Sequence, residues 1–250
     1  MVNKPNHPKV SIVTVTFNAR AALEKTINSI INQKFTDYEY IIIDGNSQDN
    51  TSSIIDKYKS HIDVYVSEKD GGVYYAMNKS LNFITGDWVI FLNAGDTFAS
   101  DDTLGDIFCK KYDEKYCAIF GDAYRDNRGK LSYIKANPFW NYSPFSYGSG
   151  ICHQSIFINS IIMKRIKYDV KYRIASDFDM MVRLYSLSRN FLYVNLPICT
   201  YETSYGLSAR NRLKALEECR LITNREKDTE YWKNYLLLSA KYVVRRILNV

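Results

Sequence analysis

The sequence lacks the patterns that identify secreted, disulfide-bonded or membrane-spanning proteins. Its 250 residues include five cysteines, widely spaced and without a CxxC pair, so neither a disulfide framework nor a zinc ribbon is expected. Residues 1–9 contain no apolar segment typical of an export signal. Lys241, Arg245 and Arg246 interrupt the most apolar stretch, 235–250, which therefore falls short of the ~18 uncharged residues of a spanning helix. We expect a protein of the reducing cytoplasm that does not cross a membrane.

Two phosphate-binding patterns are also missing. The chain has no GxGxxG motif after its first predicted strand and no P-loop ending in Gly-Lys-Ser/Thr, which argues against a dinucleotide site or a P-loop site. A bound phosphate would have to be held by a metal ion and by side chains. The pair Gly71 and Gly72 lets the backbone approach a ligand closely, although an ordinary turn explains it equally well.

Composition and charge exclude further classes of protein. Hydrophobic residues make up 46% and charged residues 24% of the chain, which is the balance of a globular core and not of a disordered protein. The formal net charge is +6, and residues 205–250 contain ten Lys/Arg against five Asp/Glu. A nucleic-acid-binding protein spreads basic residues over its binding face. We therefore expect no nucleic acid partner, and an anionic surface or partner for the C-terminal region.

Apolar runs and helical periodicity alternate along the chain. Strands are predicted at 9–17, 38–44, 62–66 and 87–92, and helices at 21–34, 50–58 and 73–83. Beyond residue 100 the pattern predicts helices at 101–112 and 177–187 and strands at 118–121, 154–158 and 191–194. Three strand–helix repeats with nearly continuous apolar strands predict an α/β fold with a mostly parallel central sheet, covered on both faces. Residues 209–250 have the composition of a basic, amphipathic helical extension.

Polar residues gather directly after four of the predicted strands. These strand ends are 16–18, 44–47, 68–72 and 93–96. Because ligands bind at the carboxyl ends of parallel strands, we expect the four ends to converge on one pocket. Asp44, Asp70 and Asp96 would bring carboxylates together there, and a divalent metal or hydrogen-bond donors must offset their repulsion. Helix capping is the alternative for any one of them taken singly.

Three residues further along the chain are candidates for acid–base or ligand chemistry. Asp177 and Asp179 lie two positions apart at a predicted helix start, so they point in different directions and only one faces a substrate. We choose Asp177; the alternative is that both are first-turn acids favoured by the helix dipole. His153 precedes a predicted strand, where a structural histidine and a metal or phosphate contact fit the sequence equally well.

The order of the motifs carries a family resemblance. The motifs are VSIVTVTFN at 10–18, DGNSQDNT at 44–51, EKDGGVY at 68–74, AMNK at 76–79, GDW at 86–88, LNAGD at 92–96, CHQS at 152–155 and ASDFD at 175–179. This series resembles the family 2 glycosyltransferases of the GT-A fold, most of all the bacterial branch that builds O-antigen and other surface polysaccharides. The resemblance covers residues 9–208. It predicts a catalytic domain over 1–208, with a nucleotide-sugar half at 9–100 and an acceptor half at 101–208, followed by the extension at 209–250.

The resemblance implies a role for individual residues. Thr16, Phe17 and Asn18 would line the base and ribose of a nucleotide-sugar donor, and Asp44 would bind the uracil or the ribose. The other implied donor contacts are Asp70, Gly71, Asn78, Lys79 and Asn93. Asp177 would be the general base of an inverting transfer, since a carboxylate must take the proton of the acceptor hydroxyl.

The resemblance also implies a metal ion, with two departures from the family pattern. Asp96 would hold Mn²⁺ or Mg²⁺ at the end of a DxD-like motif, where the metal stabilises the leaving diphosphate. Gly95 stands where the motif usually has its middle acid, so Asp96 alone would contribute a carboxylate. Tyr75 stands where the family branch usually has aspartate, which concerns a contact on the sugar side of the donor.

The expected protein is an inverting hexosyltransferase that moves glucose or galactose from a UDP-sugar to an undecaprenyl-diphosphate-linked oligosaccharide. Aromatic and basic residues in 231–250 suit a helix on the anionic inner leaflet, and a helix packed on the catalytic domain is the alternative. The loop at 137–150 is expected to face the substrate. A sugar nucleotidyltransferase is a rival function, but residues 16–20 lack the glycine-rich loop it needs. A non-catalytic nucleotide-sugar-binding protein is another, against which Asp96 and Asp177 speak.

Overall fold

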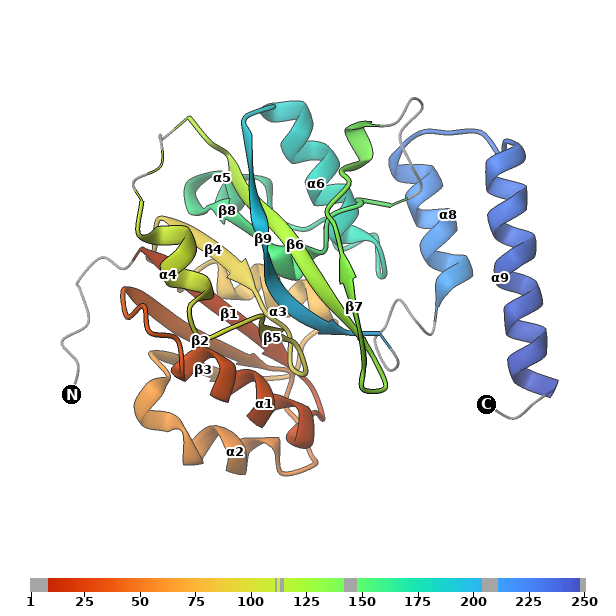
Figure 1. Ribbon diagram of the computed structural model, residues 1–250. Coiled ribbons are helices and arrows are strands. Elements are labelled where there is room, and N and C mark those ends of the chain that lie inside the picture. The colour runs from red at the N-terminus through yellow and green to blue at the C-terminus, as the bar shows by residue number, and fades with distance from the viewer. Residues whose placement is uncertain (1–8, 111, 113–114, 142–147, 204–210, 248–250) are drawn as a thin grey trace.

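A computed structural model describes residues 9–110, 112, 115–141, 148–203 and 211–247, with side chains described as far as residue 240. This part of the chain is built on one nine-stranded sheet in the order β3-β2-β1-β4-β8-β6-β9-β5, with β7 beside β6. Helices lie on both sides of the sheet (Figure 1). The structure thus has the α/β architecture that the alternating pattern predicts.

The first half of the sheet is parallel. Its elements are β1 (Val10–Thr16), α1 (Arg20–Ile31), β2 (Tyr38–Asp44), α2 (Thr51–Lys57), β3 (Val64–Ser67), α3 (Val73–Ser80) and β4 (Trp88–Phe91), with a 3-10 turn at Lys59–His61. All pairings within β3-β2-β1-β4 are parallel. Every residue of β1, β2 and β4 is buried, because helices cover both faces. The strands predicted in this half all form, with ends that differ by one or two residues.

Successive residues of the strands belong to two separate cores. Val13 and Ile41 face the core that α3, α5 (Ser160–Ile166) and α6 (Ser176–Leu187) close. Ile12 and Ile42 face the core that α1 and α4 (Thr103–Phe108) close. Side chains of a strand alternate between the two faces of its sheet, so an uninterrupted apolar strand supplies both cores at once. This explains why the strands read as continuous apolar runs.

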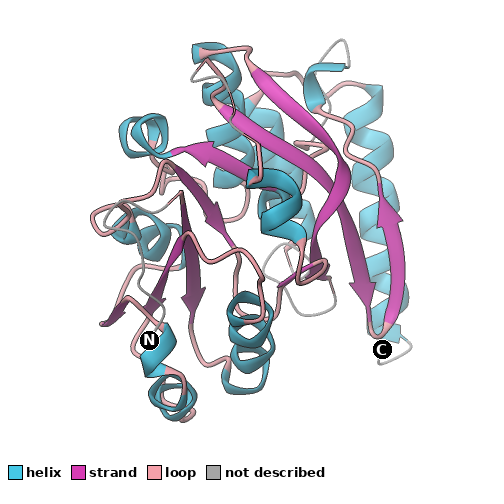
Figure 2. Cartoon of the chain, turned by 60° about the vertical axis from the view of Figure 1, so that its left-hand side comes forward, coloured by secondary structure: helices cyan, strands magenta, loops and turns pink. Residues whose placement is uncertain are grey.

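The second half of the chain is mixed. Its elements are β5 (Thr97–Phe98), α4 (Thr103–Phe108), β6 (Ala118–Asn127), β7 (Lys130–Ile134), β8 (Ile156–Asn159), α5 (Ser160–Ile166), α6 (Ser176–Leu187) and β9 (Phe191–Glu202), with 3-10 turns at Phe139–Asn141 and His153–Ser155. The β6–β9 pair is parallel, and β4–β8, β8–β6, β6–β7 and β9–β5 are antiparallel. The mostly parallel arrangement that we expected therefore holds for the first half only. Figure 2 shows the long β6 and β9 beside each other.

Three elements are absent from the sequence prediction. β5 has two residues, and β7 is a short, largely exposed strand of a hairpin, so neither has an apolar run to reveal it. α5 follows β8 directly, with only Asn159 and Ser160 between two short apolar stretches, so the seven-residue helix is hard to separate from the strand in the sequence pattern. The loop at 137–150 is described only at its ends, where Phe139 is fully buried and Trp140 stacks on Tyr185 with ring centroids 4.8 Å apart. The start of this loop therefore belongs to the core, and 142–147 lie outside the described residues.

The C-terminal region forms two helices, α8 (Arg212–Ile222) and α9 (Thr229–Ile247). α8 packs against α6, and its Cys219 belongs to the same core as α3 and α6. α9 lies beside α8 (Figure 1) and buries Tyr231 while exposing Trp232, Leu236 and Leu237. No helix among the described residues is long and apolar enough to cross a membrane.

Candidate active site

The carboxyl ends of β1, β2 and β3 bring the predicted donor residues to one edge of the sheet. Thr16 is paired with Asp44, and Asp44 with Ser67, in the parallel register. Asp44 is 1% exposed. Its carboxylate accepts hydrogen bonds from the Ser47 backbone N–H (3.0 Å), the Ser47 hydroxyl and the Ser67 hydroxyl (2.6 Å). The structure thus places Asp44 under the site as the anchor of the loop that follows β2.

The loops after β1 and β2 are joined by reciprocal hydrogen bonds. The Asn18 backbone N–H donates to the Ser47 hydroxyl (2.8 Å), and the Gln48 backbone N–H donates to Asn18 Oδ1 (2.8 Å). Asn18 has a φ of 48°, a left-handed conformation that asparagine tolerates better than most residues. The exposed edge of the sheet is therefore a fixed surface and not a pair of independent loops.

An exposed aromatic ring and an unpaired hydroxyl lie on this surface. Phe17 is 63% exposed, and Thr16 Oγ1 is buried without a hydrogen-bond partner. A Cβ atom at Gly45 would lie 3.2 Å from both the Phe17 ring and Asp70 Oδ2, so Gly45 keeps open the space between them. An exposed aromatic face beside acceptors and donors is the kind of surface on which a nucleobase stacks.

Three other predicted donor residues have contacts within the protein. Asp70 accepts the backbone N–H of Gly72 (2.8 Å). Gly71 is packed under the ring of Tyr75, which is 48% exposed: a Cβ at Gly71 would lie 2.8 Å from that ring. Lys79 forms an ion pair with Glu68 (2.8 Å). These residues form the wall beside α3.

Asn78 differs from the other predicted donor contacts. Its side-chain amide donates to the Tyr168 carbonyl (2.9 Å) and accepts the Tyr168 backbone N–H (2.8 Å). Both ends of the amide are therefore used within the protein. Asn78 thus joins α3 to the segment before α6, and its contact with the donor stays a prediction.

A chain of polar groups crosses from β4 to α6. The Asn93 amide nitrogen lies 3.1 Å from His153 Nε2, and His153 Nδ1 lies 3.5 Å from Asp177 Oδ2. The Tyr74 hydroxyl lies 3.1 Å from Asp177 Oδ1. Burial lowers the pKa of His153, against the smaller opposing effect of Asp177. The imidazole is therefore neutral at pH 7, with its proton on Nδ1 facing Asp177 and its Nε2 accepting from Asn93.

Two groups in this chain remain available to a ligand, the Asp177 carboxylate and the Asn93 side-chain oxygen. The Asp177 side chain is 25% exposed and remains accessible, unlike Asp44. Asn93 Oδ1 is a buried acceptor without a partner, and such atoms are rare unless a ligand or water completes them. Tyr74 was not foreseen, because one tyrosine among 21 gives no distinguishing signal.

Asp179 points away from the site, as the two-residue spacing predicts. It is 8% exposed and pairs with Arg183 (2.7 Å). Arg183 also donates to the Ile166 and Lys167 carbonyls (2.5 and 2.8 Å). Burial raises the pKa of Asp179, while the guanidinium opposes that rise. Asp179 thus fastens α6 to the end of α5, and the structure separates it from Asp177.

Asp96 is a second buried carboxylate among the candidates. It is 6% exposed, and its carboxylate accepts hydrogen bonds from Gln154 Nε2 (2.6 Å) and from the Glu202 backbone N–H (3.0 Å). Burial raises its pKa to about 7, although both hydrogen bonds act in the opposite direction. The carboxylate is therefore partly protonated at neutral pH unless a cation lies beside it.

The residues present fit a metal ion of a particular kind. Among the described residues, no group of three or more His, Cys, Asp or Glu side chains is placed to hold an ion by itself. Mg²⁺ is commonly bound through one or two carboxylates together with substrate phosphates. The Asp96 carboxylate and the unpaired Asn93 Oδ1, three residues apart on one turn, match that limited protein contribution. A metal here would take most of its ligands from a bound diphosphate.

The sheet topology and the strand-end site define a class of protein, the GT-A glycosyltransferases. Comparison with known proteins makes this specific. The family model described as Glycosyl transferase family 2 matches residues 11–185. The chain belongs to that family.

Two relatives show how far the similarity extends. "PGL/p-HBAD biosynthesis glycosyltransferase" of Mycobacterium bovis is 28% identical over 211 residues, which cover 80% of this chain and 79% of the relative. "GalNAc(5)-diNAcBac-PP-undecaprenol beta-1,3-glucosyltransferase" of Campylobacter jejuni is 33% identical over 132 residues, which cover 50% of this chain and 41% of the relative.

Solved structures show the same fold. TarS of S. aureus, residues 1–349 in complex with UDP, superposes with a TM-score of 0.67 at 16% identity, covering 86% of this chain and 65% of TarS. The chain thus spans slightly less than two thirds of that structure. The mannosyltransferase PcManGT of Pyrobaculum calidifontis, in complex with GDP-Man and Mn²⁺, superposes with a TM-score of 0.68 at 16% identity, covering 95% of this chain and 70% of PcManGT.

Proposed function

We propose that the chain is an inverting glycosyltransferase that moves glucose or galactose from a UDP-sugar to an undecaprenyl-diphosphate-linked oligosaccharide, in the synthesis of O-antigen or another surface polysaccharide. The observation that carries the proposal is the group Asn93–His153–Asp177, which leaves an accessible carboxylate beside the strand ends. The UDP complex of TarS and the undecaprenol-linked substrate in the name of the Campylobacter relative support the donor and acceptor classes.

The donor is held at the ends of β1 to β4. The nucleobase stacks on Phe17, and the ribose hydroxyls pair with groups such as Thr16 Oγ1, which has no partner in the protein. Asp96 and Asn93 Oδ1 would hold Mn²⁺ or Mg²⁺ against the diphosphate, where the ion supplies Lewis-acid stabilisation of the leaving UDP. The Mn²⁺ in the PcManGT structure supports this assignment.

Asp177 is the general base. An acceptor hydroxyl attacks the anomeric carbon from the face opposite the UDP, its proton passes to the Asp177 carboxylate, and the bond to the diphosphate oxygen breaks. The neutral His153 directs its Nδ1–H toward Asp177 Oδ2, and Tyr74 lies against Oδ1. These contacts hold the carboxylate in one orientation but leave it able to accept a proton. Attack from the opposite face gives a β-linkage from an α-linked donor.

The protein works at the cytoplasmic face of the inner membrane. α9 exposes Trp232, Leu236 and Leu237 on a region that carries most of the net positive charge. Exposed aromatic and aliphatic side chains together with basic residues favour an anionic lipid surface, which is where a lipid-linked acceptor lies.

Calorimetric titration with UDP, with and without Mn²⁺, tests the donor site first. We expect binding that requires both Mn²⁺ and Asp96, and that Asp96→Ala abolishes. Absence of UDP binding under both conditions would remove the basis of the proposal.

A second measurement tests the base. UDP release from UDP-glucose or UDP-galactose to water, in the presence of Mn²⁺, needs no acceptor. We expect Asp177→Asn to slow this release by about 10²-fold or more while leaving the Kd for UDP unchanged. Normal release by this variant would exclude Asp177 as the base. A sugar nucleotidyltransferase would instead release diphosphate from UTP and a sugar phosphate.

A further inference from the structure

Glu218 on α8 binds three consecutive backbone N–H groups of the loop before α6. Its Oε1 accepts from Arg173 (3.2 Å), and its Oε2 accepts from Ile174 (2.8 Å) and Ala175 (2.9 Å). The side chain is 7% exposed. A carboxylate so far removed from water is costly to bury without strong partners, and here the partners are backbone donors at the start of a helix, where the dipole favours a negative charge.

The loop that Glu218 holds also adjoins the base. The Ile174 carbonyl lies 2.9 Å from the Tyr74 hydroxyl, and the same hydroxyl lies 3.1 Å from Asp177 Oδ1. Asp177 is in the first turn of α6, two residues after the last N–H that Glu218 binds. The segment that leads into the first turn of α6 is therefore held by Tyr74 of α3 and by Glu218 of α8.

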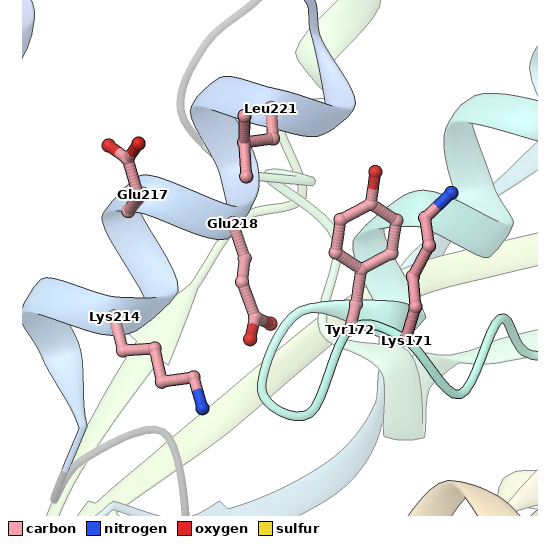
Figure 3. Close-up of a pocket in the computed structure, with 6 residues that line it drawn as sticks. All are labelled: Lys171, Tyr172, Lys214, Glu217, Glu218 and Leu221. Carbon is pink, nitrogen blue, oxygen red and sulfur yellow. The ribbon is translucent and has the colours of Figure 1, made fainter.

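A pocket lies next to the Glu218 contact. A cavity of about 540 Å³ lies between α8 and this loop, lined by Lys171, Tyr172, Lys214, Glu217, Glu218 and Leu221. Figure 3 shows the Glu218 side chain directed at the loop, whereas Glu217 points the other way. Ile174 and Ala175 of this loop are buried, so the Glu218 carboxylate is the partner of two buried backbone N–H groups that would otherwise be left unsatisfied.

We propose that Glu218 is a positioning residue for the transfer reaction: it fixes the 173–175 loop and, through it, the orientation of the Asp177 carboxylate. This rests on the proposed role of Asp177 as base. It makes α8 part of the catalytic apparatus and not an appendage of the catalytic domain. A base displaced by about 1 Å loses on the order of 10²-fold in rate, so a contact two residues from the base has a direct kinetic effect.

The test compares Glu218→Gln with Glu217→Gln in the full-length chain. Glutamine at 218 keeps the size but turns an N–H₂ group toward a backbone donor. Glu217 is the matched control, because it is the neighbouring carboxylate of the same helix and pairs with Arg220 and Tyr231. The measurements are UDP release from UDP-glucose with Mn²⁺, the Kd for UDP, the melting temperature, and hydrogen–deuterium exchange at residues 173–175.

We expect Glu218→Gln to lower kcat at least tenfold, with the KM for UDP-glucose and the Kd for UDP within twofold of wild type and with faster exchange at 173–175. Glu217→Gln should keep wild-type kcat. A purely structural role would instead lower the melting temperature and weaken UDP binding together. The inference is overturned if Glu218→Gln has wild-type kcat, or if both variants lose activity equally.

Two further variants keep the test decisive. If Glu218→Gln does not fold, Glu218→Asp keeps the charge but shortens the side chain by one CH₂ group, and faster exchange at 173–175 with wild-type kcat in that variant overturns the inference. Asp177→Asn separates the two proposals. If it is inactive while Glu218→Gln is normal, only the positioning role fails. If it is fully active, the base assignment fails and the positioning role with it.

Discussion

The ionisation of Asp96 should make the free energy of unfolding depend on pH. The carboxylate is 6% exposed, and burial raises its pKa to about 7 from an ordinary value near 3.8. Each pKa unit corresponds to about 1.4 kcal/mol, so ionising Asp96 in the folded chain costs about 4 kcal/mol relative to the unfolded chain. Asp96→Asn keeps the size of the side chain and removes the ionisation.

The sign follows from the direction of the shift. Because the folded-state pKa is the higher one, the stabilisation is complete below pH 3.8, where both states are protonated. It is lost as the pH rises toward 7, because the unfolded chain ionises first. About 3 kcal/mol of the loss falls between pH 5 and pH 8. Asparagine does not titrate, so any constant cost of its altered hydrogen bonds is the same at both pH values.

Urea denaturation in EDTA at pH 5 and pH 8 measures the effect. We expect Asp96→Asn to gain about 3 kcal/mol relative to wild type on going from pH 5 to pH 8. A difference between the two proteins that is the same at both pH values, within about 1 kcal/mol, would refute the argument. UDP with Mn²⁺ should stabilise wild type and not the variant, since binding requires the ionised carboxylate.

The remaining predictions concern the nucleotide surface, the packing of the sheet and the C-terminal helix. Gly45→Ala fills the space beside the exposed ring after β1, so the Kd for UDP should rise at least fivefold in calorimetry; an unchanged Kd would place the nucleotide elsewhere. Gly86→Ala puts a Cβ 2.7 Å from a backbone nitrogen of β1 and should lower the unfolding free energy by about 1–3 kcal/mol. The control Gly105→Ala, within α4 and with nothing near its Cβ, should raise it by about 0.5–1 kcal/mol; the reverse order would contradict the packing. Trp232→Ser with Leu236→Ser should reduce co-flotation with phosphatidylglycerol vesicles at least fivefold without changing UDP release to water, and unchanged flotation would exclude α9 as the lipid-binding helix.

Local sequence predicts the first half of the fold well, because a helix follows each of β1, β2 and β3, and because β1, β2 and β4 are buried on both faces. Residues 38–44 read as a strand with the bounds that β2 has. The later strands are harder to predict. β7 pairs with the adjacent β6 in a hairpin, but it is short and largely exposed, so it lacks an apolar run. β5 has only two residues and gains its hydrogen bonds from β9, which is remote in the chain. No local pattern records a pairing of that kind.

The candidate site, too, could be predicted from the sequence only in part. The sequence alone predicts that polar residues follow β1 to β4 and that Asp177 and Asp179 point in different directions. Both predictions succeed because strand ends and helical spacing are local properties. The sequence does not predict which partner each side chain binds. Asn78 is bound to a backbone 90 residues away, and Asp96 is buried by a strand that begins at Phe191.

By itself, then, the sequence determined the α/β class, the family and the strand ends that carry the site, since hydrophobic period and motif order are properties of short segments. Only the tertiary structure decided that His153 lies between Asn93 and Asp177, and that Glu218 of α8 holds the loop before α6. These contacts join residues that lie 24 to 60 positions apart in the chain. The free energy that selects them comes from packing the whole sheet.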